Sequence, residues 1–221
     1  SVNHQAANRG APEDYDEWRD LGARGWGWSD VLPYFRKLEN DADFDGPLHG
    51  KDGPLPVQRM PRRDWCGFSE GVAQAAEAAG LPYIADQNGE WQDGWFPATQ
   101  NNVPGHRVSA AMAYLDAATR KRPNLRIVAR AHVQAILMEG KRAVGVRAEI
   151  NGKAEDFRAG EVILSAGAIH SPAMLMRAGI GPGAQLAGMG IPVISDLPGL
   201  GSNLRDHPGI PILAYLSPGA R

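Results

Sequence analysis

The stretch that decides the fold reads Glu161-Val162-Ile163-Leu164-Ser165-Ala166-Gly167-Ala168-Ile169-His170-Ser171-Pro172. Residues 161–165 have the apolar pattern of a buried strand, and the small residues after them predict a turn. Ser171 as N-cap and Pro172 as first helical residue predict a helix over 172–178. Small side chains let a backbone approach a ligand, and the free N–H groups of the helix would face it. The same pattern also suits close packing of a helix on a sheet, so both interpretations stay open.

The segments on either side of this stretch predict a strand meander and more helix. Strands are expected at 126–130, 133–138 and 143–150, with Asn151-Gly152 as the strongest hairpin signal. A short helix is expected at 183–187. The intervening Gly179-Ile180-Gly181-Pro182-Gly183-Ala184 superficially fits the dinucleotide fingerprint G-x-G-x-x-A. That fingerprint must follow a strand, whereas a helix is expected here, so these glycines predict a helix end.

The first 125 residues predict helices joined by turns. Helices are expected at 12–21, 29–39, 69–79 and 106–120, with a strand at 55–59. Ser29 or Asp30 is expected to cap the second helix. Together with an apolar run at 210–215 that reads as a strand, these elements predict an α/β fold with mixed α+β character.

One motif in this part of the chain suggests a hydrolase. Gly67-Phe68-Ser69-Glu70-Gly71 matches G-x-S-x-G, the nucleophile elbow, which needs a buried strand directly before it. Residues 61–66 cannot form that strand. Ser69 is therefore expected to cap a helix.

Composition excludes several classes of protein. The chain has 221 residues, with 23 Lys and Arg against 25 Asp and Glu, a net charge of −2 that offers no broad surface for nucleic acid. The single cysteine, Cys66, excludes a disulfide framework and fits a reducing compartment. No apolar run approaches the roughly 18 residues of a membrane span. We therefore expect a soluble, cytoplasmic protein without a membrane span or a nucleic-acid partner.

Histidine, cysteine and tryptophan are the residues that bear on metal binding and on ring-shaped ligands. The six histidines show no close ligand spacing and one cysteine cannot form a thiolate site, so no metal is expected. The six tryptophans predict either packing in a loop-rich core or an aromatic wall around an apolar ligand.

Taken together, these residues resemble the glucose–methanol–choline (GMC) oxidoreductases, a family of FAD enzymes. The stretch 167–181 is similar to the second family signature, with Ala178 where serine is usual. Three further regions match in the family's order, at 12–37, 105–115 and 201–208. Within the family, 43–50 and 93–97 are most similar to the branch of hydroxymethylfurfural oxidases and aryl-alcohol-oxidase-like enzymes.

The resemblance implies parts of two domains. Residues 1–55 would belong to the FAD-binding domain with its flavin-covering segment, and 56–98 to the substrate-binding domain. Residues 99–205 would return to the FAD-binding domain with a strand meander, and 206–221 would begin the return to the substrate domain. Trp95 and Phe96 would line the approach to the site.

The resemblance also implies how the cofactor is held. The enzyme would oxidise an aromatic or furanic alcohol by hydride transfer to FAD, with oxygen or another acceptor taking the electrons. Asn3 and His4 would approach the flavin ring, although the family usually has glycine at position 4. The cofactor-binding residues carried over from the family are Ser1, Asn3, His4, Val133, Ala166 and Gly167.

Two parts of the family pattern have no counterpart in this chain. The N-terminal G-x-G-x-x-G unit and the segment with the catalytic histidine are both missing, and His207 is not that histidine. We therefore assign no catalytic residue and expect an internal piece of a larger flavoenzyme that is inactive alone. The alternative is a short non-catalytic scaffold that acts as a binding or assembly module. A third alternative, an NAD-linked dehydrogenase, would need the dinucleotide fingerprint directly after a strand, and the sequence has none in that position.

Overall fold

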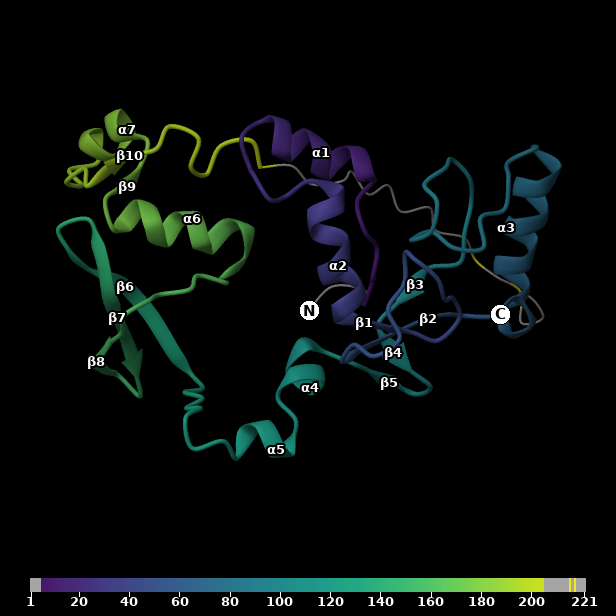
Figure 1. The fold of residues 1–221 in the computed structure, drawn as a ribbon, viewed down its shortest axis with the longest axis horizontal. Helices are drawn as coiled ribbons and strands as arrows, with labels where there is room; N and C mark the ends of the chain where they lie inside the picture. Colours follow the sequence, from purple (N-terminus) through teal and green to yellow (C-terminus); the bar gives the residue numbers. More distant parts are fainter. Residues whose placement is uncertain (1–4, 205–214, 216, 218–221) are drawn as a thin grey trace. The chain divides into compact units, whose positions relative to one another are not determined.

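The structure is a computed structural model that describes residues 5–204, 215 and 217 (Figure 1). The chain divides into two compact units at residue 125, and each contains helices and strands. This confirms the predicted mixed α/β class. Most of the strand expected at 210–215 lies outside the described residues.

The first two helices form where the sequence predicts them. They are α1 (Pro12–Asp20) and α2 (Trp28–Leu38). The carboxylate of Asp30 accepts a hydrogen bond from the N–H of Gly27 at 3.1 Å. The N-cap is therefore Gly27, and the prediction of Ser29 or Asp30 as cap was wrong, because Asp30 closes the helix start from inside its first turn.

Helix α3 (Gly67–Ala78) contains the G-x-S-x-G motif. Its N-cap is Cys66, so Ser69 lies inside the first turn, with its Oγ 3.3 Å from the sulfur of Cys66. The prediction of Ser69 as a cap was wrong by three residues. The segment before the helix is the 3-10 turn η1 (Arg62–Asp64). A nucleophile elbow is therefore excluded, as predicted from the context of the motif.

The single helix expected at 106–120 is divided into three elements. They are β5 (His106–Arg107), which pairs with β4 (Asn102–Val103), then α4 (Ala110–Tyr114) and α5 (Ala117–Arg120). The side chain of Asp116 accepts from the N–H of Thr119 at 2.6 Å and starts a new helix inside the predicted one. Residues that prefer N-cap positions interrupt a helix even where the apolar spacing continues.

A small sheet lies at the centre of the first unit. In it, β1 (Glu39–Asp41) runs parallel to β2 (Leu55–Arg59), which pairs antiparallel with β3 (Thr99–Gln100). Strand β2 confirms the prediction at 55–59. Because side chains alternate along a strand, Glu39 and Asp41 share one face of β1, and both are buried.

The second unit contains a three-stranded meander that includes the strands predicted at 133–138 and 143–150. Its sheet has the order β6 (Ala131–Glu139), β7 (Arg142–Ile150), β8 (Lys153–Arg158), all antiparallel. The Asn151-Gly152 turn is confirmed, with φ of 52° and 77° at the two residues, as a type I′ turn requires.

Two strands predicted for this unit are absent from the described residues. Residues 126–130 are irregular and end in a turn before β6, and residues 161–165 form no strand. A strand needs a neighbour to receive its hydrogen bonds, and no described segment pairs with 161–165. The third strand is instead the polar Lys153–Arg158, because the tight turn places it directly beside β7.

Helix α6 (Gly167–Arg177) begins five residues before the predicted start at Pro172. The hydroxyl of Ser171 accepts a hydrogen bond from the N–H of Ala166 at 3.0 Å instead of capping a helix at Pro172. As predicted, the helix ends before Gly179. The unit is completed by β9 (Ile180–Gly181), α7 (Gly183–Gly188) and β10 (Ser195–Asp196), where β9 and β10 pair in parallel.

No helix among the described residues has the length and apolar composition needed to cross a membrane.

Candidate functional site

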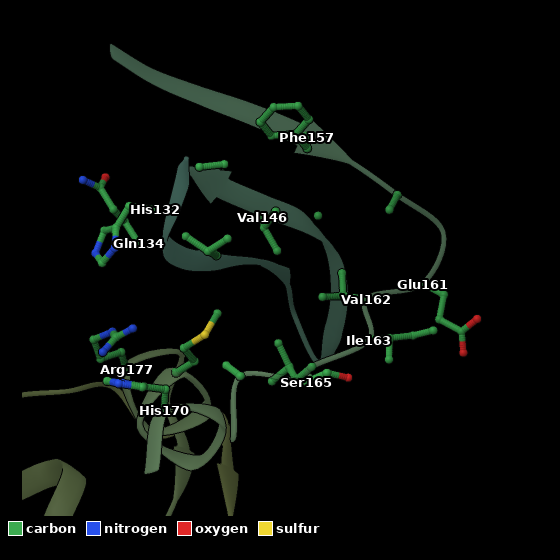
Figure 2. Close-up of a pocket in the computed structure, with 17 residues that line it drawn as sticks. His132, Gln134, Val146, Phe157, Glu161, Val162, Ile163, Ser165, His170 and Arg177 are labelled. Carbon is green, nitrogen blue, oxygen red and sulfur yellow. The ribbon is translucent and has the colours of Figure 1, made fainter. Parts of the chain in front are cut away.

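A cavity of about 960 Å³ lies between the meander and helix α6 of the second unit (Figure 2). Four parts of the chain line it: the first residues of β6, the neighbouring residues 145, 146 and 157 of β7 and β8, the irregular stretch 159–166, and one face of α6. The helix contributes His170, Met174 and Arg177, which lie on one face because their spacing is four and three residues. This volume is at the upper end of the range of ligand-binding cavities in proteins.

Two of the predicted cofactor-binding residues line this cavity. Val133 lies on β6 and Ala166 is the N-cap of α6, 33 residues apart in sequence. Gly167 follows as the first residue of α6, with a φ of 87° and open space where a Cβ would stand. The other predicted residues, Ser1, Asn3 and His4, lie outside the described part of the chain.

The wall of this cavity fits the nucleotide part of FAD. Strand β6 is at the edge of its sheet, so backbone groups that face away from β7 are available to a ligand. The first N–H groups of α6 lack acceptors inside the helix and favour polar or anionic groups. Small residues, Gly145, Ala159 and Ala166 among them, form part of the wall beside larger side chains such as Phe157 and Met174.

Polar side chains gather at one end of the cavity, and sequence reasoning did not assign them to the site. Figure 2 shows His132 and Gln134 of β6 facing His170 and Arg177 of α6, whereas Glu161 lies at the opposite side. His132 and Gln134 are two residues apart on a strand and share one of its faces, and His170 and Arg177 are seven apart on a helix and share one of its faces. Once the two elements are known to face each other, these spacings indicate that all four side chains line the same cavity.

A second, apolar cavity of about 430 Å³ lies in the first unit. Trp65, Phe68, Trp95 and Phe96 supply aromatic walls, so the predicted Trp95 and Phe96 do line one cavity. The rings of Trp65 and Trp95 meet edge to face with centroids 6.2 Å apart. Both indole N–H groups donate to backbone carbonyl oxygens, those of Met60 and Leu81. The aromatic faces are therefore fixed in place.

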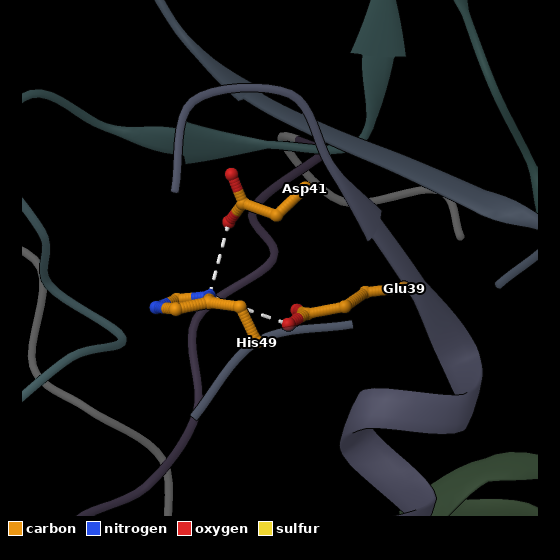
Figure 3. Close-up of side chains that lie close together, drawn as sticks. All are labelled: Glu39, Asp41 and His49. Carbon is orange, nitrogen blue, oxygen red and sulfur yellow. Dashed lines mark ion pairs between the residues drawn. The ribbon is translucent and has the colours of Figure 1, made fainter. Parts of the chain in front are cut away.

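The first unit also buries a cluster of charged side chains around His49, which sequence reasoning missed. Figure 3 shows the carboxylates of Glu39 and Asp41 on two sides of the His49 ring. Each has an oxygen 3.3 Å from Nδ1 of His49. The other ring nitrogen, Nε2, lies 2.8 Å from a carboxylate oxygen of Asp86. His49 has only 4% of its surface exposed, and Asp41 has none.

Two arginines complete this cluster. Arg59 contacts both carboxylate oxygens of Asp41, at 2.8 and 2.7 Å, and one of Asp86 at 2.7 Å. Arg9 pairs with Glu39. A fourth carboxylate, that of Asp43, lies 3.6 Å from Arg59 but is exposed to solvent. Apart from Asp43, three carboxylates balance two guanidinium groups and one protonated imidazole. We call Arg9, Glu39, Asp41, His49, Arg59 and Asp86 the buried ion cluster.

The cluster shifts the pKa values of its members toward their charged forms. The carboxylates of Asp41, Asp86 and Glu39 raise the pKa of His49 from 6.5 to about 10. Burial by itself raises the pKa of Asp41, but contacts with His49 and Arg59 outweigh it and hold that pKa well below its usual range. The pKa values of Glu39 and Asp86 are lowered against burial in the same way. His49 is therefore an imidazolium at neutral pH.

The carboxylates and imidazole of Glu39, Asp41 and His49 lie close enough together to hold a metal ion. In this structure the arginines take that place, because Arg9 pairs with Glu39 and Arg59 with Asp41. An imidazolium also has no lone pair for a metal. The chemistry of the cluster is that of an internal ion network.

Comparison with known proteins places these features in a family. The sequence model described as GMC oxidoreductase matches residues 1–209. The 5-(hydroxymethyl)furfural oxidase of Methylovorus sp. (strain MP688) is 49% identical over 222 residues, which cover all of this chain and 42% of that protein. The oxygen-dependent choline dehydrogenase of Brucella anthropi is 44% identical over 208 residues, 94% of this chain and 37% of that protein.

Solved structures agree with the sequence comparison. The pyridoxine 4-oxidase from Mesorbium loti superimposes with a TM-score of 0.81 at 33% identity, over 89% of this chain and 39% of that one. An FAD-dependent oxidoreductase from Chaetomium thermophilum gives a TM-score of 0.78 at 32% identity, over 90% and 36%. The chain spans less than half the length of each of these relatives.

Proposed function

Because this chain belongs to the GMC oxidoreductase family, we propose that it is part of an FAD-dependent enzyme that oxidises a primary alcohol. The observation that carries the proposal is the cavity between β6 and α6, which brings Val133 and Ala166 together from distant parts of the sequence. Both residues were predicted to contact FAD from the family resemblance alone. The alternative of a non-catalytic scaffold has no observation in its favour.

The residues of this chain bind and orient, and the cofactor supplies the redox chemistry. FAD, when bound, accepts a hydride from the alcohol carbon. Val133 and Ala166, with the neighbouring Gly167, would hold the nucleotide part of FAD. The family resemblance assigns Ser1, Asn3 and His4 to cofactor binding, with Asn3 and His4 at the flavin ring. Residues 1–55 and 99–205 belong to the FAD-binding domain, whereas 56–98 and 206–221 belong to the substrate-binding domain.

The aromatic cavity at Trp65 and Trp95 bears on the substrate class. Flat aromatic walls suit a furan or benzene ring. Aromatic faces can also hold a quaternary ammonium such as choline through cation–π contacts, so the walls by themselves do not separate these two classes of substrate. The choice of a neutral furanic or aromatic alcohol is supported by the 49% identity to a 5-(hydroxymethyl)furfural oxidase.

Catalysis needs polypeptide beyond these 221 residues. A general base must lie within hydrogen-bond reach of the substrate hydroxyl, and no residue in this chain is assigned that role. The isolated chain is accordingly inactive, and the electrons pass to oxygen or another acceptor in the complete enzyme.

The test uses the full-length protein that contains this chain. It is expected to purify with the visible absorbance of bound flavin and to oxidise 5-(hydroxymethyl)furfural faster than choline, measured as peroxide release or reduction of an artificial acceptor. Ala166→Leu, which fills the cavity wall, should weaken FAD binding. Ala187→Leu, the same substitution at an exposed position of α7, is the matched control.

Three results would contradict the proposal. They are a full-length protein that binds no flavin, one that oxidises neither alcohol, and equal FAD affinity in the two leucine variants. Turnover by the isolated 221-residue chain would contradict the requirement for further segments.

A further inference from the structure

The buried ion cluster holds one short segment of backbone from two directions. That segment, 7–9, begins three residues after His4, the last residue predicted to approach the flavin ring. His49 connects the two directions, because its ring contacts both Glu39 and Asp86. Glu39 is linked to the segment through Arg9, and Asp86 is linked to it through Asn88.

The first route runs through Arg9. Its guanidinium pairs with Glu39, and its Nη1 donates to the backbone carbonyl of Leu48 at 2.6 Å. The same side chain lies over the ring of Phe35, 5.3 Å from its centroid. Arg9 is only 7% exposed, so a change in the position of Glu39 or Leu48 must also move the backbone of Arg9.

The second route runs through Asn88. Its backbone N–H donates to Asp86 at 3.1 Å, so the Asp86 carboxylate fixes its position. Its side chain then makes two bonds to the segment: Nδ2 donates to the carbonyl of Ala7 at 2.8 Å, and Oδ1 accepts from the N–H of Arg9 at 3.1 Å. Asn88 is 3% exposed. The side chain of Asn88 thus bonds to the backbone at both ends of the segment and fixes the distance between residues 7 and 9.

The loop that carries His49 is itself held against the end of α2. A Cβ at Gly50 would lie 1.7 Å from the carbonyl oxygen of Arg36, so no larger residue fits there. The N–H of Gly50 donates to the Glu39 carboxylate at 2.9 Å. His49 therefore has little freedom to move, and its ring holds the carboxylates of Glu39 and Asp86 in fixed positions.

We propose that His49, Arg9 and Asn88, which we call the clamp, are positioning residues for the flavin, because they fix the backbone a few residues after Asn3 and His4, which the family resemblance assigns to the flavin ring. This inference rests on the proposed function for the identity of the cofactor. None of the three needs to touch the flavin. Small displacements at a reacting centre cost up to about 100-fold in rate, so fixing the backbone three residues from the expected contact is enough to affect chemistry.

The experiment uses the full-length flavoprotein and the variant Asn88→Ala, which removes both side-chain bonds to the segment. Leu186→Ala is the control: Leu186 is 1% exposed and lies on α7, so its loss destabilises the fold without touching the clamp. Three quantities are measured well below the melting temperature: FAD affinity of the apoprotein, the visible flavin spectrum, and the single-turnover rate of flavin reduction by the alcohol.

We expect Asn88→Ala to alter the flavin spectrum and slow flavin reduction by about tenfold or more, whereas Leu186→Ala lowers the melting temperature and leaves both unchanged. If Asn88→Ala does not fold, Arg9→Lys replaces it: the charge beside Glu39 remains but the planar fork that reaches Leu48 is lost. The expected change is then in the same direction and smaller.

The outcomes separate this inference from the proposed function. A wild-type protein without flavin refutes the proposed function. A flavin-loaded wild type whose clamp variants keep its spectrum, affinity and reduction rate refutes the positioning role alone. If the clamp variants alter the flavin spectrum but the wild type oxidises no alcohol, the positioning role is supported and the proposed alcohol substrate is refuted.

Discussion

Replacement of His49 by glutamine tests the charge balance of the buried ion cluster. Glutamine is close to histidine in size and its amide can still donate to Asp86, but it carries no charge. Three buried carboxylates would then face two arginines. Removing one partner from a buried ionic group leaves an uncompensated charge and costs about 3–5 kcal/mol.

The pKa of His49 sets an independent limit on this cost. It is 6.5 in the absence of partners and about 10 in the folded protein. A pKa raised by folding means that the folded state holds the proton more tightly, and each pH unit corresponds to about 1.4 kcal/mol. The upper limit is therefore about 5 kcal/mol, in agreement with the range for a broken buried pair.

The same pKa gives the direction of the pH dependence. Because the folded pKa is the higher one, the stabilisation is fully present below pH 6.5. It decreases as the pH rises and is lost as the pH passes the folded pKa of about 10. The stability difference between wild type and His49→Gln should therefore be largest near pH 6 and shrink steadily toward pH 10.

The assay is thermal and urea unfolding of full-length wild type and His49→Gln at several pH values from 6 to 10. Asp156→Asn is the control, since it breaks an ion pair with Arg147 that is exposed to solvent. A difference that stays constant or grows from pH 6 to 10 would refute the assignment of an imidazolium at His49.

Three further predictions concern stability. Gly145→Ala should lower the free energy of unfolding by about 2 kcal/mol or more, because its φ is 152° and a Cβ would lie 2.1 Å from the carbonyl oxygen of Phe157; Gly160→Ala, with open space around it, is the control in urea unfolding. Leu186→Ala should cost about 2–5 kcal/mol in the same measurement, and a smaller loss would mean that the site collapses around the missing atoms. EDTA should leave the melting temperature unchanged, because Arg9 and Arg59 occupy the carboxylates of the ion cluster; a drop that added Zn²⁺ reverses would show a metal instead.

Local sequence signals predicted the elements whose formation depends on near neighbours. Helices α1 and α2, strand β2 and the Asn151-Gly152 hairpin all follow from spacing and turn chemistry within a few residues. The errors arose where a local pattern competed with another signal or needed a distant partner. Asp116 divided a predicted helix by capping a new one, and residues 161–165 have strand-like composition but no neighbour to pair with among the described residues.

Short, contiguous motifs were enough to predict the family, the cofactor class and the segments that would carry the site. Which distant residues meet depends on the tertiary structure. Nothing local connects Arg9, His49 and Asp86, or Val133 with Ala166, yet the fold buries the first group as a charge-balanced cluster and lines one cavity with the second. Burial and charge pairing depend on where the chain returns on itself, and no periodic pattern within a single segment contains that information.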